Sequence, residues 1–103
     1  MKKTTLYLGL FDKDTKAQKI TTLEAADIVS RLVLGVGYAG ATISESFGIY
    51  THARGEIVKE PGLRIEILDS ADSKDAALVK DLKKVFNQES ILIKKNNINF
   101  DFV

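Results

Sequence analysis

The sequence predicts an α+β fold in which two helices cover one face of an antiparallel sheet. Several short segments alternate apolar with other residues, as half-buried strands do, and two longer segments place apolar residues three and four positions apart, as amphipathic helices do. Along the chain these segments follow the order strand, helix, strand, strand, helix, strand. That order is typical of the ferredoxin-like βαββαβ sandwich, and the length suits one α+β domain over residues 1–103.

The first strand is predicted over residues 4–11, because one of its faces carries only leucine. Alternation along a strand sends successive side chains to opposite faces of the sheet. The leucine face should therefore meet the core, and the other face should lie away from the helices. The two faces are Leu6, Leu8 and Leu10, and Tyr7, Gly9 and Phe11.

A helix is predicted to begin after a polar loop at residues 12–16. Thr21 and Glu24 have the spacing of a capping box, in which two side chains satisfy free backbone N–H groups at a helix start. The residues that follow form one apolar stripe at helical spacing. The stripe consists of Ala25, Ile28, Val29, Leu32 and Val36.

Three glycines that follow this stripe spell G-x-G-x-x-G, the pattern of dinucleotide-binding loops. A dinucleotide site needs a strand before the glycines and a helix after them, because the helix N-terminus holds the pyrophosphate. Here the helix precedes Gly35 and the strand follows Gly40, which is the reverse order. We therefore interpret the glycines as the end of the helix.

A hairpin is predicted next, with a strand at residues 41–52, a turn at residues 53–55 and a return at residues 56–59. Pro61 has no backbone N–H to donate, so it predicts an edge strand or a bulge. Alternation resumes over residues 62–68. Leu63, Ile65 and Ile67 lie on one face, and Arg64, Glu66 and Leu68 on the other.

The second helix is predicted to be capped within residues 70–73 and to end at Asn87 or Gln88. The last main strand is expected at residues 90–94. A turn at Asn96 and Asn97 should then lead to a short extra C-terminal strand at residues 98–102, added at an edge of the sheet. The apolar stripe of this helix consists of Leu78, Val79, Leu82, Val85 and Phe86.

Two helices on one face leave the other face of the sheet bare. That face should carry Tyr7, Phe11 and Leu68. Large apolar patches are seldom left in water. We therefore expect a second copy of the chain, or a ligand, to cover it, and we favour a homo-oligomer.

Composition excludes several classes of function. The net charge of +1 and the absence of long basic runs argue against a nucleic acid polymer as partner. Without cysteine and with His52 as the only histidine, the chain lacks the usual ligands of a metal site, and no cofactor is expected. No nucleophile has a catalytic motif around it, so no catalytic residue is assigned. The short apolar run after Lys2 and Lys3 suits neither a signal peptide nor a membrane span, which favours the cytoplasm.

One mixed cluster of side chains suits ligand binding instead. Arginine has a planar group that fits anions, aromatic rings offer stacking faces, and amides can read base edges or ribose hydroxyls. The alternative without a ligand is that the hairpin side chains are solvated, and that the polar residues at the end of the second helix hydrogen-bond to the last carbonyl groups of that helix. The candidate ligand-binding residues are Tyr50, His52, Arg54, Glu60, Arg64, Asn87 and Gln88.

The chain also resembles a family of small bacterial and phage proteins known only as a domain of unknown function. The resemblance rests on the segment Thr5-Leu6-Tyr7-Leu8-Gly9 near the start and on Gln88-Glu89-Ser90-Ile91-Leu92 after the second helix. Gly40-Ala41-Thr42 and the hairpin from Gly55 to Glu60 carry it between them. The resemblance implies the α+β sandwich and no assigned activity.

These observations favour a non-enzymatic protein that binds a small anionic or nucleotide-like ligand. The lysine- and asparagine-rich tail suggests a low-GC host or its phage, and in a phage the protein would be a sponge that sequesters a nucleotide-derived immune signal in the host cytoplasm. One alternative is a dimeric ferredoxin-like enzyme that uses Tyr50, His52 or Glu60 as acid or base. The other is a protein-interaction module.

Overall fold

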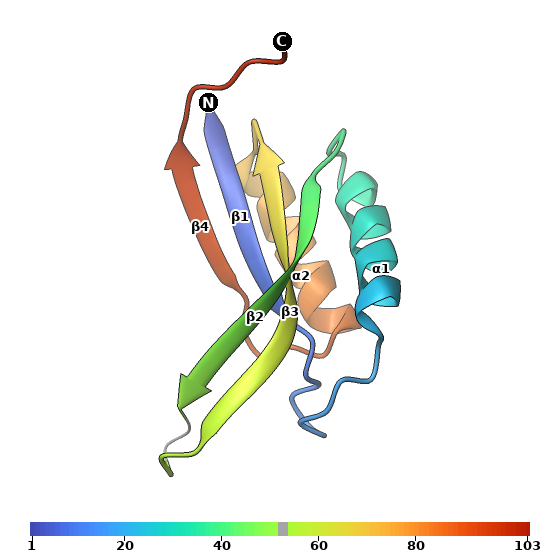
Figure 1. Cartoon of the computed structure of the whole chain (residues 1–103). Coiled ribbons are helices and arrows are strands. Elements are labelled where there is room, and N and C mark those ends of the chain that lie inside the picture. The colour runs from blue at the N-terminus through green and yellow to red at the C-terminus, as the bar shows by residue number, and fades with distance from the viewer. Residues whose placement is uncertain (52–53) are drawn as a thin grey trace.

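The computed structural model describes residues 1–51 and 54–103. Four strands form one antiparallel sheet in the order β2-β3-β1-β4, and both helices pack on the same face of it (Figure 1). This is the predicted ferredoxin-like arrangement. The elements are β1 (Lys2–Gly9), α1 (Thr22–Gly35), β2 (Thr42–Thr51), β3 (Ile57–Leu68), α2 (Asp72–Val85) and β4 (Leu92–Asn97).

The core lies between the sheet and the helices, and the predicted alternation of the strands is confirmed. Leu6 of β1 pairs with Ile65 of β3, and both side chains are fully buried. The opposite face of the sheet, which we call the helix-free face, carries Tyr7 and Arg64 as neighbours. The buried apolar side chains are Leu6, Leu8, Leu10, Ala25, Val29, Val33, Tyr38, Leu63, Ile65, Ile67, Leu78, Leu82 and Phe86.

The two helices start differently. The Thr21 hydroxyl accepts a hydrogen bond from the Glu24 N–H at 3.2 Å, so the predicted cap of α1 is confirmed. At α2 the N-cap residue is Ala71, which has no side-chain cap. The Ser70 hydroxyl, one of the groups in the expected cap at residues 70–73, lies 2.7 Å from the Thr4 hydroxyl of β1 and makes a tertiary contact instead.

Two sequence-based expectations about the sheet need correction. Pro61 lies in β3, an inner strand of the sheet that runs through it without a bulge, and the predicted edge is present only locally, because β3 has no partner on its β1 side beyond Gly62. The register explains this, because the last β1–β3 pair is Gly9 with Gly62, and the Pro61 carbonyl accepts from Leu10 N–H at 3.0 Å just beyond it. The missing N–H therefore falls where the ladder with β1 ends.

The extra C-terminal strand at residues 98–102 is also absent from the structure, and the expected turn at Asn96 and Asn97 is not formed. Both asparagines belong to β4, where they pair with Lys3 and Lys2. Residues 98–103 continue without regular structure. Pairing with β1 therefore overrides the local turn preference of asparagine.

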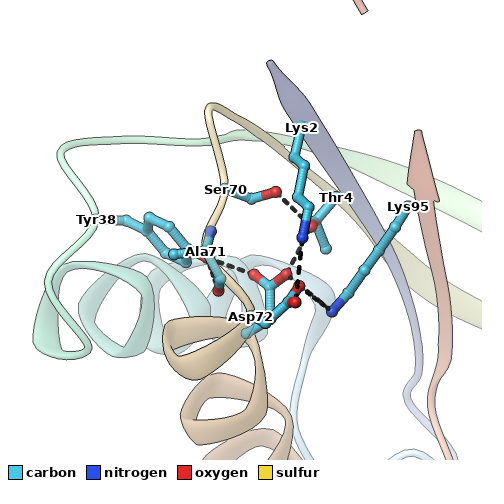
Figure 2. A network of polar contacts seen from close by, with 8 residues as sticks. Lys2, Thr4, Tyr38, Ser70, Ala71, Asp72 and Lys95 are labelled. Atoms are coloured by element: carbon cyan, nitrogen blue, oxygen red, sulfur yellow. Dashed lines mark hydrogen bonds and ion pairs between the residues drawn. The ribbon is translucent and has the colours of Figure 1, made fainter. Parts of the chain in front are cut away.

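A polar network ties the helices to the sheet at the end where β1 begins (Figure 2). The buried Asp75 carboxylate of α2 accepts hydrogen bonds from the Tyr38 hydroxyl and, at 2.7 Å, from the Thr4 hydroxyl. Tyr38 also accepts from the Ala71 N–H at 3.0 Å. Burial, followed by the Asp75 hydrogen bond, raises the pKa of Tyr38 to about 12.

The hairpin of β2 and β3 extends past the rest of the sheet. Pairing of β1 with β3 stops at Gly62, whereas β2 and β3 remain paired from Phe47 with Pro61 to Thr51 with Ile57. Figure 1 shows this two-stranded part projecting beyond both helices. We call residues 47–51 and 57–61 the arm.

Candidate functional site

A pocket of about 400 Å³ lies where β1 ends and the arm begins. Its volume is within the range of small-molecule sites. Three parts of the chain form it: β1 with the loop that follows, the base of the arm, and the segment between α2 and β4. The lining residues are Tyr7, Gly9, Phe11, Asp12, Lys13, Lys16, Tyr50, Glu60, Gln88, Glu89 and Ser90.

Two glycines allow other groups to lie close to the backbone at the bottom of this pocket. A Cβ at Gly9 would lie 2.6 Å from the carboxyl atoms of Glu60, so glycine is what lets Glu60 extend across β1. A Cβ at Gly62 would lie 2.6 Å from the Leu8 carbonyl oxygen. A second hollow of about 200 Å³ shares Tyr7, Gly9 and Glu60 with the first and extends over Gly62. Together the two hollows mark the helix-free face at this end of the sheet.

Two polar side chains are fixed by the backbone around Phe11. The Phe11 N–H donates to the Glu60 Oε2 at 2.9 Å, and the Gln88 Nε2 donates to the Phe11 carbonyl at 2.6 Å. A carboxylate has about four acceptor positions, and a primary amide has two N–H donors and an oxygen. Both groups are therefore oriented by the protein and retain capacity for a ligand.

The loop that forms one wall is held by Asp12. Its Oδ1 accepts from the N–H groups of Asp14 and Thr15 at 3.0 and 2.8 Å. The Asn87 side chain donates to Asp12 Oδ2 at 2.7 Å and to Asp14 Oδ2 at 2.8 Å. The Asn87 hydrogen bond, followed by that from Thr15, holds the pKa of Asp12 well below its usual range. Asn87 thus connects the C-terminal end of α2 to the loop after β1.

The structure brings together some of the predicted site residues and separates others. Tyr50, Glu60 and Gln88 all line the pocket, although the first two lie far from Gln88 in the sequence. Asn87 supports the pocket wall through Asp12 and does not line the pocket itself. His52 lies outside the described residues.

The two predicted arginines do not line this pocket. Arg54 is exposed in the turn at the tip of the arm. Arg64 donates to Glu66 at 2.6 Å on the helix-free face, and hydrogen bonding to Tyr7 and then to Glu66 raises its pKa. The positive charges at the pocket are instead Lys13 and Lys16.

Sequence reasoning missed these two lysines as site residues, because they lie in a polar loop without a motif. It placed Tyr7 and Phe11 on the helix-free face and expected a second copy or a ligand to cover them, but it favoured association and did not include them among the ligand-binding residues. The one local signal was Gly9, a glycine inside an otherwise regular strand, which often marks a close approach of other groups.

A family model described as "Protein of unknown function (DUF3574)" matches residues 3–102. The chain belongs to this family. The resemblance to a family of unknown function is therefore confirmed. No curated protein matches the sequence.

Solved structures share the fold. A phage SAM lyase in complex with S-methyl-5'-thioadenosine is 24% identical, with a TM-score of 0.73 over 92% of this chain and 79% of that chain. CutA from Synechococcus elongatus is 14% identical, with a TM-score of 0.62 over 94% and 76% of the two chains. The periplasmic divalent cation tolerance protein CutA from Archaeoglobus fulgidus is 16% identical, with a TM-score of 0.62 over 99% and 88%. At these identities the comparisons establish the ferredoxin-like fold.

Two further observations concern the described residues alone. Neither α1 nor α2, with 14 residues each, is long and apolar enough to cross a membrane. No group of three or more histidine, aspartate or glutamate side chains in residues 1–51 and 54–103 is arranged to hold a metal ion.

Proposed function

We propose that this protein binds an adenine thionucleoside, of the S-methyl-5'-thioadenosine type, in the pocket lined by Tyr50, Glu60 and Gln88. The observation that carries the proposal is the convergence of aromatic, carboxylate and amide groups on one pocket of suitable volume. The fold shared with a phage protein that holds S-methyl-5'-thioadenosine supports the choice of ligand.

Each part of such a ligand has a matching group in the pocket. Tyr7, Phe11 and Tyr50 offer rings on which adenine can stack, a contact worth about 1–3 kcal/mol per base. The Gln88 amide has the donor and acceptor needed for an adenine edge. The Glu60 carboxylate suits the two ribose hydroxyls or a positively charged sulfur, because it accepts hydrogen bonds and carries negative charge.

Lys13 and Lys16 extend the range of ligands that fit. They place positive charge on the loop side of the same pocket, whose other charged lining residues are the carboxylates Asp12, Glu60 and Glu89. An anionic group, such as the carboxylate of an amino acid attached to the sulfur, would be favoured there. The ligand we propose is therefore nucleoside-like, with an anionic end, and it is consistent with a sponge that sequesters such a compound in a phage-infected cell.

Calorimetric titration with S-methyl-5'-thioadenosine tests the proposal. Glu60→Gln should weaken binding about ten- to a hundredfold, because a charge-assisted hydrogen bond contributes about 1.5–3 kcal/mol. Glu24→Gln, an exposed carboxylate on α1 away from the pocket, is the matched control and should bind like the wild type. Equal affinity of all three proteins, or no heat at millimolar ligand, would contradict the proposal.

A second candidate function is an enzyme that cleaves SAM and releases S-methyl-5'-thioadenosine. The observation in its favour is Glu60, whose carboxylate is held by the Phe11 N–H inside the pocket, where it can hold and orient the positively charged sulfonium of SAM. The C–S bond would break with its electron pair passing to sulfur, which becomes a neutral thioether, while the carboxylate of the same SAM molecule forms the new bond to carbon and leaves as a lactone. Chromatography of SAM after incubation with the protein separates the two functions. A binder returns SAM unchanged, whereas an enzyme converts it in molar excess over protein, and Glu60→Gln should abolish the conversion.

A further inference from the structure

The arm exposes large apolar side chains on its two strands. Phe47, Ile49 and Ile57 are 67%, 68% and 70% exposed, respectively. The register pairs Phe47 with Pro61 and Thr51 with Ile57, so all three apolar residues point to the same side of the arm. A two-stranded ribbon is only marginally stable in water by itself. Such a surface is typical of a contact with another molecule.

The outer edge of the arm is also unprotected. β2 is the terminal strand on its side of the sheet, and its ten residues contain neither lysine nor proline. Natural edge strands usually carry such residues, or are covered, because exposed N–H and C=O groups recruit another strand. The edge of β2 therefore has the properties of a strand that is paired in the assembled protein.

The opposite edge of the sheet, β4, carries Lys94 and Lys95, so by the same rule it is protected against backbone pairing, and the surface it offers is one of side chains. Leu92 of β4 is 60% exposed and pairs with Tyr7, so it lies on the helix-free face beside the pocket. Lys94, two positions along β4, is exposed and lies 6.0 Å from the centre of the Tyr7 ring. Glu45 on β2 and Glu56 before β3 are exposed carboxylates near the arm, which also carries the exposed Lys59 opposite Ile49. The two edges thus share apolar surface, and Lys94 of one copy can pair with Glu45 or Glu56 of the other.

We propose that a second copy of this chain covers the arm, with the β2 edge of one copy lying along the β4 edge of the other. A second copy is favoured because one chain carries both complementary surfaces, and a head-to-tail contact of this kind can close into a ring. In this arrangement the arm of one copy lies over Leu92 of the other and closes the pocket beside it. The ligand part of this inference rests on the proposed function, whereas the association part does not.

Coupling between association and ligand binding follows from this geometry. A ligand enclosed by both copies binds the assembly more tightly than the single chain. Thermodynamic linkage then requires that the ligand also strengthens the assembly. Ile49 lines neither of the hollows at the site, and its side chain points to the opposite side of the arm from Tyr50, which lines the pocket, so we expect an effect of its replacement on ligand affinity to come through the second copy.

Sedimentation velocity of the full chain at about ten micromolar tests the association. The wild type should sediment as an oligomer, and Ile49→Glu and Ile57→Glu should sediment as monomers with an unchanged far-UV circular dichroism spectrum. Leu34→Glu is the matched control, because Leu34 is 57% exposed on α1, and it should remain oligomeric. A monomeric wild type, or oligomeric arm variants, would overturn the proposal.

Mixing two variants tests the shared pocket, with S-methyl-5'-thioadenosine as the probe. Ile49→Glu should lose about tenfold or more in affinity although its own pocket is intact, and Glu60→Gln should lose affinity although its arm is intact. A mixture should regain binding, because the arm of a Glu60→Gln copy can close the pocket of an Ile49→Glu copy. Full affinity of monomeric Ile49→Glu, or no recovery in the mixture, would overturn the shared pocket. If the wild type does not bind the probe, the proposed function fails while sedimentation still decides the association.

Discussion

Replacing Tyr38 with phenylalanine should destabilise the fold strongly, because the hydroxyl group serves two partners in the buried network. It donates to the Asp75 carboxylate, and it accepts from the Ala71 N–H at 3.0 Å at the start of α2. A hydrogen bond to a charged group contributes about 1.5–3 kcal/mol and a neutral one about 0.5–1.5 kcal/mol. We therefore expect Tyr38→Phe to lower the free energy of unfolding by about 2–4 kcal/mol.

Urea unfolding followed by far-UV circular dichroism measures this loss, and a double-mutant cycle assigns it. Tyr38→Phe, Asp75→Ala and the double variant should give a coupling energy of about 1.5–3 kcal/mol, because each single change removes the same contact. A shift in the midpoint without a change in slope would show that the folded state is otherwise intact. A cost below about 0.5 kcal/mol for Tyr38→Phe, or additive single changes, would refute the reasoning.

Three further predictions follow from the geometry. The pKa of Tyr38 is about 12 in the folded state and about 10 when unfolded, so the stabilisation by its neutral hydroxyl is complete below about pH 10 and is lost as the pH rises through 12. The urea midpoint of the wild type should therefore fall between about pH 9 and pH 11, and it should fall less in Tyr38→Phe. Gly9→Ala should displace the Glu60 carboxylate, whose atoms lie 2.6 Å from the new methyl group, and calorimetry should show weaker ligand binding at nearly unchanged stability. Leu82→Ala should cost about 2–5 kcal/mol in urea unfolding, whereas Val85→Ala on the same helix should cost under about 1 kcal/mol, because Leu82 is 0% and Val85 43% exposed.

The apolar patterns were sufficient for the architecture because they reflect local geometry. Leu6, Leu8 and Leu10 alternate with a period of two, and all three are buried as expected. In the second helix Leu78, Leu82 and Phe86 are buried, whereas Val85 of the predicted stripe is 43% exposed. The stripe was therefore correct along the whole helix except at Val85, which lies at its solvent side.

Local rules failed where pairing between distant segments decided the outcome. The rule that proline favours an edge strand did not anticipate that β1 ends beside Gly62, so that Pro61 can lie in an inner strand. The rule that asparagine favours turns did not anticipate that Asn96 and Asn97 extend β4 along β1. At the asparagines the free energy of the strand ladder outweighs the turn preference of the residue, whereas at Pro61 no ladder hydrogen bond is lost, because pairing with β1 has ended.

The sequence by itself determined the order of the elements, the core face of each strand and the family, because periodicity and short motifs are properties of neighbouring residues. Only the tertiary structure decided which candidate site residues meet. Glu60 reaches the backbone of Phe11 across 49 positions of the chain, and Gln88 reaches it across 77. Those contacts depend on strand order, register and the absence of a side chain at Gly9, so only a folded sheet brings the three groups to one pocket.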